Sequence, residues 1–436
     1  MFGFLSAARI ANLTESQNIA FQSFLQNKNI LITGQAGTGK SHLIKKIVAH
    51  CERTRRNIVV TAMTGAAACL INGKTIHSWG SLGVGDKSAI FLADKIIKSW
   101  PKKTKWKHCN VLVIDEVSMM NASFFELVEE VARMVRGNDR AFGGIQMVLL
   151  GDFYQLPPVA RVGEDGRFCF ESERWKDVIH ESVILREVMR QKDPIFQKVL
   201  SEIRVGNISD ETIQIIQSRI GVEPDLSSGI IPTILYSTRK SVEKINKEEF
   251  NKLPDETVIE YDTNYEITGE RVTKMKEDEF VRYQEIIDRE NNYEKVLQLS
   301  IGAQVMLLKN IDQERGLVNG SRGVVIDFNE NDLPYVRFVN KEVELIDRHE
   351  YTYEISSVTS IIAKQIPLSL AWCTTIHKSQ GQSLDCVRIN IGRGIFEYGQ
   401  TYVALSRART LDGLFVAEFD PAKVRVHPKV KEFFGE

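Results

Sequence analysis

The sequence predicts an α/β protein with two domains built on parallel sheets and a small β-barrel inserted in the second domain. The first third of the chain holds four short, continuously apolar runs, at residues 30–33, 58–61, 111–115 and 147–152. Such runs, without alternation, are typical of parallel strands that helices cover on both faces. A second set follows at residues 230–236, 387–391 and 414–417. Within this second set, short β-like runs separated by Gly and Asn turns indicate a barrel.

These runs also predict the domain boundaries. We expect the first domain at residues 1–165, with a small wedge-like subdomain near residues 80–107. The second domain is expected in two parts, residues 166–296 and 367–436, on either side of the barrel at residues 297–366. Residues 252–296 are charged and show little periodicity, so we expect them to be irregular.

Composition narrows the class of protein. The 436 residues include 56 Lys plus Arg and 57 Asp plus Glu, a net charge of −1, and 43% are hydrophobic. This argues against wholesale disorder and against a polycationic surface, but a local basic groove stays possible. No apolar run approaches the ~20 residues of a membrane helix. The six cysteines form no CxxC pair, and the first ten residues are too weak for a signal peptide, so we expect an intracellular protein.

The strongest motif lies at residues 34–41, GQAGTGKS, after a predicted strand and before an apolar-periodic segment. It fits G-x-x-x-x-G-K-[ST], the loop whose backbone N–H groups hold phosphates. Lys40 is expected to reach the β- and γ-phosphates, and Ser41 to bind Mg²⁺. The remaining residues expected to wrap the phosphates are Gly34, Gly37, Thr38 and Gly39.

Hydrolysis needs further groups, and polar residues at the ends of two more predicted strands supply them. Asp115 ends the third run and is placed to hold Mg²⁺ through water, whereas Glu116 can polarise the attacking water. The alternative is a pair of exposed turn carboxylates. Gln155, just past the fourth run, is a candidate contact to the γ-phosphate or to that water.

Phosphoryl transfer also favours an arginine that stabilises the developing charge. Arg190 and Arg407 are the candidates, and both fall outside the expected first domain. If both come from the second domain, ATP binding closes a cleft between the domains. An arginine usually lies on the solvated surface. The motifs around Arg190 and Arg407 are what favour a role at the phosphates for these two residues.

An ordered set of motifs extends over nearly the whole chain. The segments are LTESQ (13–17), GQAGTGKS (34–41), TAMTGAAA (61–68), TIHSW (75–79), VIDEVSMM (113–120), GDFYQLPP (151–158), VMRQ (188–191) leading to EIRVG (202–206), GLVNGSRG (316–323), TIHKSQGQ (375–382) and YVALSR (402–407). In this order they resemble the PIF-type branch of superfamily-one DNA helicases, close to the RecD-like group. The resemblance implies two RecA-like P-loop NTPase domains, an SH3-like barrel inserted in the second, and 5′→3′ movement on single-stranded DNA.

The resemblance also implies roles at matching positions. Gln17 reads adenine, and Arg190 and Arg407 act as arginine fingers. The residues implied to run the ATP site are Lys40, Ser41, Asp115, Glu116 and Gln155. Those implied to contact the DNA strand are Thr64, Gly65, His77, Asn319, His377, Lys378 and Ser379. The cofactors implied are ATP and Mg²⁺, and the implied partner is single-stranded DNA. We also expect forked duplex DNA as a partner, a monomeric protein and no association with a membrane.

Several alternatives stay open at this point. Trp79 fits a base-contacting wedge or a packed core aromatic, and His377 fits a DNA contact or a hydrogen-bonded helix position. The basic run at residues 102–107 fits a solvated face or a duplex contact near a fork. For the whole chain, the alternatives are an RNA helicase, an ATP-gated single-strand-binding or loader module, and a helicase–nuclease subunit. Little sequence flanks the motifs, so we expect no accessory extensions.

Overall fold

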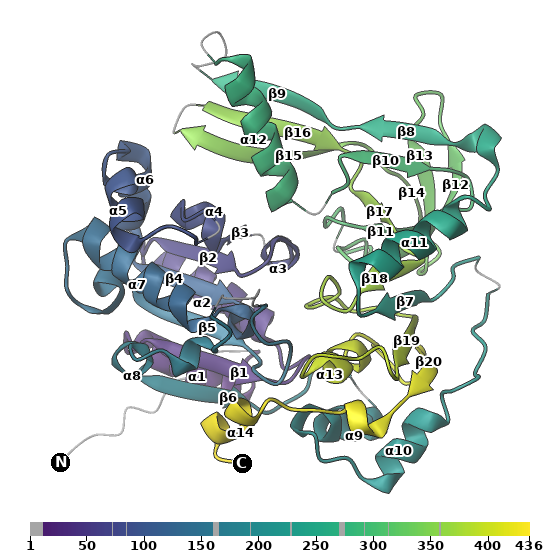
Figure 1. Ribbon diagram of the computed structural model, residues 1–436, viewed down its shortest axis with the longest axis horizontal. Helices are drawn as coiled ribbons and strands as arrows, with labels where there is room; N and C mark the ends of the chain where they lie inside the picture. The colour runs from purple at the N-terminus through teal and green to yellow at the C-terminus, as the bar shows by residue number, and fades with distance from the viewer. Residues whose placement is uncertain are drawn as a thin grey trace. The chain divides into compact units, whose positions relative to one another are not determined.

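The computed structural model describes residues 12–71, 73–83, 85–159, 165–191, 193–226, 229–269, 275–291, 293–312, 314–356 and 359–436. The chain forms two compact units, each described here by itself (Figure 1). The first unit contains residues up to 197 together with 426–436, and the second contains residues 198–425.

The first unit is built on a six-stranded sheet in which all neighbouring strands are parallel. In spatial order the strands are β3 (Lys74–Thr75), β2 (Ile58–Ala62), β4 (Val111–Asp115), β5 (Gln146–Gly151), β1 (Ile30–Gly34) and β6 (Glu181–Leu185). The four apolar runs predicted in this part of the chain correspond to β1, β2, β4 and β5. They form the centre of the sheet, so the prediction of buried parallel strands is confirmed.

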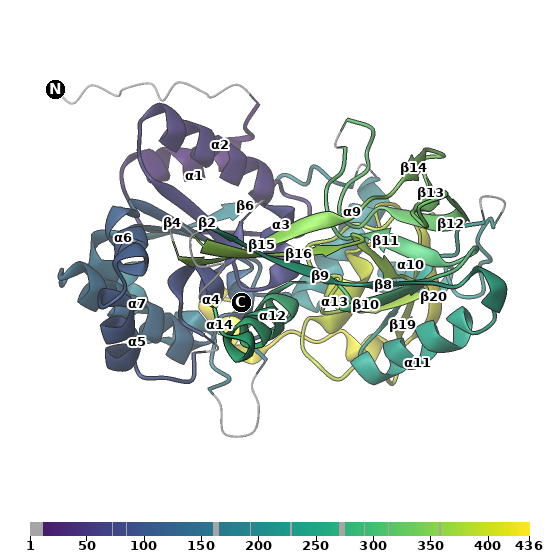
Figure 2. The same ribbon diagram turned by 90° about the horizontal axis from the view of Figure 1, so that it is seen from above.

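Helices cover this sheet on both faces. The helices are α1 (Glu15–Leu25), α2 (Lys40–Arg53), α3 (Gly65–Leu70), α4 (Ile76–Gly80), α5 (Ala89–Ile97), α6 (Trp100–His108), α7 (Ala122–Arg136), α8 (Trp175–Val178) and α14 (Pro428–Phe434). Phe21 of α1 and Leu43 of α2 pack on Ile32 in one core cluster, and Figure 2 shows both helices on one side of the sheet. Leu31 and Leu112 alternate with the residues of that cluster and are also fully buried, so the opposite face is covered too.

The expected boundary at residue 165 was wrong, because the first sheet continues beyond it. Strand β6 pairs with β1 in parallel, with Ile30 opposite Glu181. Only Val183 and Leu185 of β6 are buried, whereas Ile184 is 45% exposed. This half-buried pattern belongs to an edge strand, and it differs from the continuous runs that marked the other strands.

The second unit contains a four-stranded parallel sheet in the order β18 (Cys373–Thr375), β7 (Thr233–Tyr236), β19 (Val387–Ile391) and β20 (Leu414–Phe419). The runs predicted at residues 230–236, 387–391 and 414–417 supply three of these strands. The helices of this unit are α10 (Asp210–Gln217), α11 (Arg239–Phe250), α12 (Glu277–Glu290) and α13 (Gln400–Leu405), and α9 (Pro194–Val205) contains the boundary between the units. Two parallel-sheet domains are therefore confirmed.

The inserted β region is larger than expected. A five-stranded antiparallel sheet contains β14 (Val343–Leu345), β13 (Pro334–Phe338), β12 (Arg322–Phe328), β11 (Gln304–Leu307) and β17 (Leu368–Leu370). Two smaller sheets join β10 (Val296–Leu299) to β8 (Ile259–Asp262), and β15 (His349–Ser356) to β16 (Thr359–Gln365) and β9 (Asn264–Gly269). Residues 252–296 are therefore not irregular: they supply β8, β9 and α12, whose charged residues hid the pattern.

One core connects the larger sheet with the β8–β10 pair. Tyr261 of β8 and Leu297 of β10 lie in the same buried cluster as Val305 and Phe338 of the five-stranded sheet. The insertion therefore begins near β8 and not at residue 297. None of the helices described in either unit is long and apolar enough to cross a membrane.

Candidate functional site

The loop between β1 and α2 is shaped to hold an anion. Gly37 and Gly39 have φ angles of +87° and +80°, in the left-handed region that favours glycine. A Cβ on Gly37 would lie 2.7 Å from Arg190 Cβ, and one on Gly39 would overlap the Gln17 side chain. Helix α2 follows at once with no side chain capping its N-terminus, which leaves its first N–H groups available to a ligand.

Lys40 brings a positive charge to this loop. Its Nζ donates to Gly34 O at 2.6 Å and to Gln35 O at 3.2 Å, so the ammonium lies against the loop's own carbonyl groups. Ser41, the next residue, is exposed. The loop, its lysine and the helix N-terminus together form the arrangement that binds phosphate groups.

The N-terminal segment braces the loop from one side. Gln17 is 2% exposed, and its Nε2 donates to Thr38 O at 3.0 Å while its Oε1 accepts from Thr14 N at 3.1 Å. Glu187 accepts hydrogen bonds from Thr14 Oγ1 at 3.1 Å and from both the N–H and the hydroxyl of Ser16. The hydrogen bond from the Ser16 hydroxyl is the largest influence that lowers the pKa of Glu187 to about 2. Glu187 thus fixes the segment that holds Gln17.

Asp115 ends β4 and Glu116 follows it. The two residues are 7% and 8% exposed, so they are not the exposed turn carboxylates of the alternative. Asp115 Oδ1 accepts from Glu116 N at 2.9 Å, and Glu116 has a left-handed φ of +55°. Burial, followed by the charge of Glu116, raises the pKa of Asp115 to about 7, whereas the charge of Lys40 acts in the opposite direction. The influence of Lys40 on this pKa is consistent with the lysine and the Asp115 carboxylate lying near one another.

Gln155 lies in a tight turn after β5. Its N–H donates to Asp152 O at 2.9 Å, and the residue is 5% exposed. Within the described part of the chain, its Oε1 finds no hydrogen-bond partner, and neither do the buried hydroxyl groups of Thr33 and Ser118. An unpaired buried polar atom costs about 1–3 kcal/mol, so these atoms suit a ligand or water that pairs with them. Together with the loop and the carboxylates, they fit a nucleotide with a divalent cation.

The two arginines lie in different environments. Arg190 belongs to the first unit, where its N–H donates to Gly37 O at 3.3 Å, so the expectation that it comes from the second domain was wrong. Arg407 belongs to the second unit and is 1% exposed. Its guanidinium donates to the carbonyl groups of Ser379 at 3.1 Å and Gln382 at 3.0 Å. Its role as an arginine finger stays a prediction.

Several residues of the first unit that were predicted to contact the DNA strand already make contacts within the protein. Thr64 Oγ1 accepts from Ala67 N at 3.2 Å, and Gly65 is the first residue of α3. The His77 ring stacks on Phe124 with 4.4 Å between centroids, and burial lowers its pKa to about 4, so one ring face is not available to a base. Trp79 is 8% exposed and packs on Trp106 at 4.6 Å, which favours the core alternative.

In the second unit, the residues of the turn at 375–382 differ in their exposure to solvent. Lys378 is exposed, and His377 is half-buried, which lowers its pKa. Ser379 is fully buried and its hydroxyl donates to Ile376 O at 2.9 Å, so its side chain supports the turn and is not displayed to a ligand as expected.

Asn319 lies between β11 and β12, in a segment that approaches this turn. A Cβ on the neighbouring Gly320 would lie 3.9 Å from Gln382 Cβ, so the two segments are adjacent. The Asn319 side chain is 6% exposed, and neither its oxygen nor its nitrogen has a partner among the residues that the structure describes. Asn319 therefore has the unused hydrogen-bonding capacity that a contact to a ligand requires.

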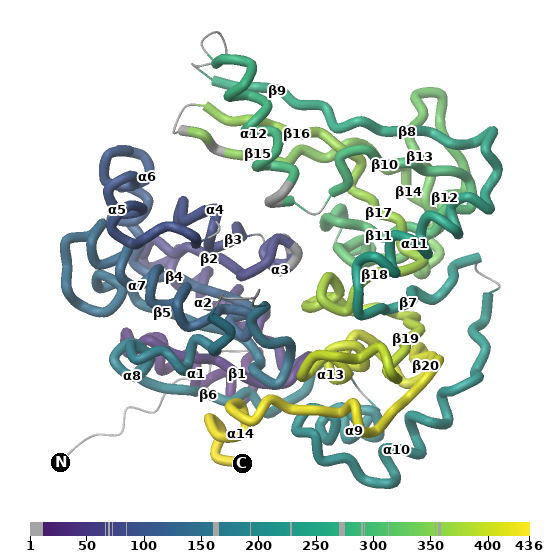
Figure 3. Tube along the Cα trace, viewed as in Figure 1, coloured from purple at the N-terminus to yellow at the C-terminus, as the bar shows by residue number. Residues whose placement is uncertain are grey.

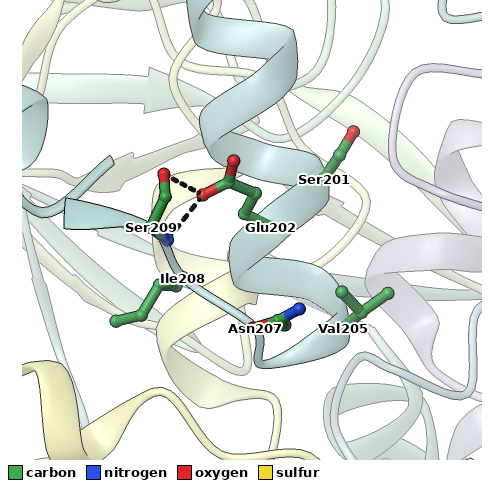
Figure 4. A pocket seen from close by; sticks show the side chains of 6 residues that line it. All are labelled: Ser201, Glu202, Val205, Asn207, Ile208 and Ser209. Carbon is green, nitrogen blue, oxygen red and sulfur yellow. Dashed lines mark hydrogen bonds between the residues drawn. The ribbon is translucent and has the colours of Figure 1, made fainter. Parts of the chain in front are cut away.

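A shallow hollow of about 450 Å³ lies between α9 and α10 and contains no predicted site residue (Figure 4). Its lining residues are Ser201, Glu202, Val205, Asn207, Ile208 and Ser209. Glu202 accepts from the N–H and the hydroxyl of Ser209 at 2.9 and 2.7 Å, which closes the turn between the two helices.

Sequence reasoning missed the bracing residues Thr14, Ser16 and Glu187, and it missed Phe124 beneath His77. A Thr14–Gln17 capping box was the one signal of this kind, since both of its residues are close in sequence. No local pattern indicates that residue 187 returns to residues 14–16.

Comparison with known proteins agrees with this site. A family model described as PIF1-like helicase matches residues 12–214, and one described as DNA helicase Pif1, 2B domain, matches residues 282–328. The ATP-dependent DNA helicase PIF1 of Xenopus laevis is 40% identical over 99% of this chain, and the alignment covers 65% of that protein. The chain thus spans less than two thirds of the length of this curated relative.

Solved structures agree over the full chain. The crystal structure of the Pif1 helicase from Candida albicans has a TM-score of 0.81 and 35% identity, covering 98% of this chain and 99% of that one. The Pif1 helicase from Bacteroides in complex with ADP-AlF3 and ssDNA has a TM-score of 0.69 and 27% identity, covering 98% and 97%. The chain, with its two RecA-like domains and inserted β domain, therefore belongs to the Pif1 helicase family.

Proposed function

We propose that this chain is an ATP-dependent DNA helicase that uses Mg²⁺ and ATP to move 5′→3′ on single-stranded DNA and to unwind duplex DNA in replication, repair or recombination. The observation that carries the proposal is the buried pair Asp115 and Glu116 beside the glycine loop and Lys40. The relative in Xenopus laevis is named an ATP-dependent DNA helicase, and the Bacteroides relative was solved with a nucleotide analogue and ssDNA.

Each group of the ATP site has a proposed task. The Lys40 ammonium exchanges its bonds to Gly34 and Gln35 for the β- and γ-phosphates. Ser41 and Asp115 hold Mg²⁺, which when bound neutralises phosphate charge. Glu116 accepts a proton from the attacking water, and Gln155 orients that water through its unpaired amide oxygen.

One glutamine and two arginines complete the proposed ATP site. Gln17 is proposed to face adenine, although its amide already pairs with Thr38 O and Thr14 N. Arg190 is placed by the Gly37 carbonyl at the edge of the phosphate loop. Arg407 is proposed to act on the γ-phosphate, for which it must first release the carbonyl groups that it now holds.

This release suggests how hydrolysis is coupled to the strand. The carbonyl groups of Ser379 and Gln382 belong to the turn that displays His377 and Lys378. When Arg407 leaves them for a phosphate, the Gln382 carbonyl loses the guanidinium as its donor, and the Ser379 carbonyl keeps Gln382 N. We infer that the grip of this turn on DNA therefore changes with the state of the nucleotide.

The DNA strand is proposed to contact backbone N–H groups and few charged side chains. Thr64 and Gly65 offer the N-terminus of α3, Lys378 offers one exposed ammonium, and Asn319 offers an unpaired amide. Such contacts bind phosphates without a polycationic surface, in agreement with the net charge of −1. Single-stranded and forked duplex DNA are the proposed partners, bound by a monomer.

Unwinding of tailed duplexes tests activity and polarity together. With Mg²⁺ and ATP, the protein is expected to separate a duplex with a 5′ single-stranded tail and to leave the same duplex with a 3′ tail intact. The Lys40→Ala variant is the control, since it lacks the phosphate-binding cation. Equal unwinding of both duplexes refutes the polarity, and stronger ATPase stimulation by a matched RNA strand favours the RNA helicase alternative.

A further inference from the structure

The last helix of the chain, α14 (Pro428–Phe434), belongs to the first unit although it follows the whole second unit in sequence. Figure 3 shows this yellow end of the chain beyond β20. Val430 of α14 is fully buried, and His427 caps the helix by accepting from Lys429 N at 3.2 Å. The helix is therefore docked and capped, and its docking surface can be identified.

Aromatic rings make this docking surface. Phe433 stacks on Phe170 with 4.3 Å between centroids and an interplanar angle of 21°, and it meets Phe153 edge-on at 5.7 Å. Phe434 stacks on Tyr154 at 5.2 Å and 18°. The two aromatic residues of α14 thus contact both residues that directly precede Gln155.

The turn that carries Gln155 is short, and hydrogen bonds within it and aromatic contacts of Phe153 with Phe168, Phe170 and Trp175 also hold it. Gln155 N donates to Asp152 O at 2.9 Å, and Tyr154 N donates to the Asp152 carboxylate at 3.3 Å. Phe153 and Tyr154 are 1% and 3% exposed, so their rings are fixed by what packs on them. A shift of either ring moves the Gln155 backbone, because the three residues are consecutive.

We propose that Phe433 and Phe434 are positioning residues that clamp the Asp152–Gln155 turn and thereby hold the Gln155 amide in its working place. The inference rests on the proposed role of Gln155 in ATP hydrolysis. The helix that carries the clamp follows shortly after residue 426, where the chain returns to the first unit.

A double-mutant cycle in the full chain tests the clamp. The arms are wild type, Phe433→Ala with Phe434→Ala, Gln155→Ala, and all three changes together, each assayed for DNA-stimulated ATP hydrolysis. A misplaced catalytic group typically costs up to about 100-fold in rate, so we expect the clamp variant to lose about 10- to 100-fold in kcat with little change in KM for ATP. In the Gln155→Ala background the clamp changes should cost little more, because both act through the same amide.

A second measurement does not depend on hydrolysis. Amide hydrogen exchange at residues 152–156 should become faster in the clamp variant, while exchange in α2 and β4 stays the same. Phe433→Leu with Phe434→Leu keeps apolar volume and should restore part of kcat. Lys429→Ala, on the exposed side of α14, is the matched control and should behave as wild type.

The outcomes separate the clamp from the function it rests on. An equal fold-loss of kcat in both backgrounds, or unchanged exchange at residues 152–156 in a folded clamp variant, overturns the clamp. Wild-type turnover by Gln155→Ala instead overturns the proposed role of Gln155, and the exchange measurement still decides whether α14 holds the turn.

Discussion

Replacement of Arg407 by alanine tests both the packing of the second unit and the proposed mechanism. The guanidinium donates to the carbonyl groups of Val403 at 2.9 Å, Ser379 at 3.1 Å and Gln382 at 3.0 Å. The first two carbonyl groups also accept from Ser406 Oγ and Gln382 N, both at 3.0 Å, and keep those donors in the variant. Of these three carbonyl groups, that of Gln382 is the one that depends on Arg407, and the Ser406 hydroxyl also loses the N–H that Arg407 donates to it at 2.7 Å.

The expected loss of stability follows from this difference. One unpaired buried carbonyl costs about 1–3 kcal/mol, and a side chain that is 1% exposed leaves a cavity when it is truncated. We therefore expect Arg407→Ala to lower the free energy of unfolding of the second unit by about 2–4 kcal/mol. Three fully orphaned carbonyl groups would have cost considerably more.

Two assays check this prediction independently. Urea unfolding, followed by circular dichroism, should show an earlier transition for the variant, and Arg407→Lys should be intermediate because an ammonium cannot bridge the same carbonyl groups. At a temperature where the variant is folded, its kcat for ATP should fall about 10³-fold or more, as for other arginine fingers, with ATP binding retained. An unchanged unfolding midpoint refutes the packing argument, and an unchanged kcat removes Arg407 from the phosphate site.

The remaining predictions concern the ATP site, the Glu187 brace and the DNA strand. Lys40→Ala should abolish ATP hydrolysis, and turnover at the wild-type rate would contradict the phosphate site. Glu187→Gln should raise the KM for ATP several-fold, because the segment around Thr14 and Ser16 loses its carboxylate acceptor. An unchanged KM would show that this carboxylate does not affect ATP binding. Since the pKa of Glu187 is lowered from 4.5 to about 2, its stabilising effect should be complete above about pH 4.5 and disappear toward pH 2, which unfolding at pH 7 and pH 3 can measure. His377→Ala should reduce DNA stimulation more than basal hydrolysis; stimulation at the wild-type level excludes this contact. DNA affinity should fall with salt, at a log–log slope of ~0.7 per phosphate neutralised, and a flat response would argue against backbone contacts.

The parts of the fold that the sequence predicted are those with a strong local pattern. Strands β1, β4 and β5 are continuously buried, and β2 is apolar at its first three positions although these are only partly buried, so each appears as an apolar run. Strand β6 and the β8–β9 region have an exposed face, and β18 has only three residues, so their patterns resemble loops. Periodicity detects burial, and it fails where a strand lies at an edge or carries charges on one face.

The site follows the same rule. The glycine loop, Lys40 and the Asp115–Glu116 pair were predicted because each is contiguous in sequence and follows a core strand. The unit to which Arg190 belongs and the burial of Ser379 were not, because they depend on contacts between distant segments. The same limit applies to the bond between Glu187 and Ser16, which joins residues 171 positions apart.

The bonds of Arg407 also restrict how the proposed helicase can couple ATP hydrolysis to DNA. Its guanidinium already supplies three of its donors to the turn and to α13, and a donor cannot serve a carbonyl group and a phosphate at once. If Arg407 is the finger, nucleotide engagement therefore competes with the internal bonds of the turn that carries His377 and Lys378. Coupling by competition predicts that DNA bound to this turn opposes withdrawal of the arginine, so DNA and the triphosphate state alter each other's affinity reciprocally. If DNA and nucleotide are measured to bind without any such coupling, Arg407 is a structural residue of the second unit.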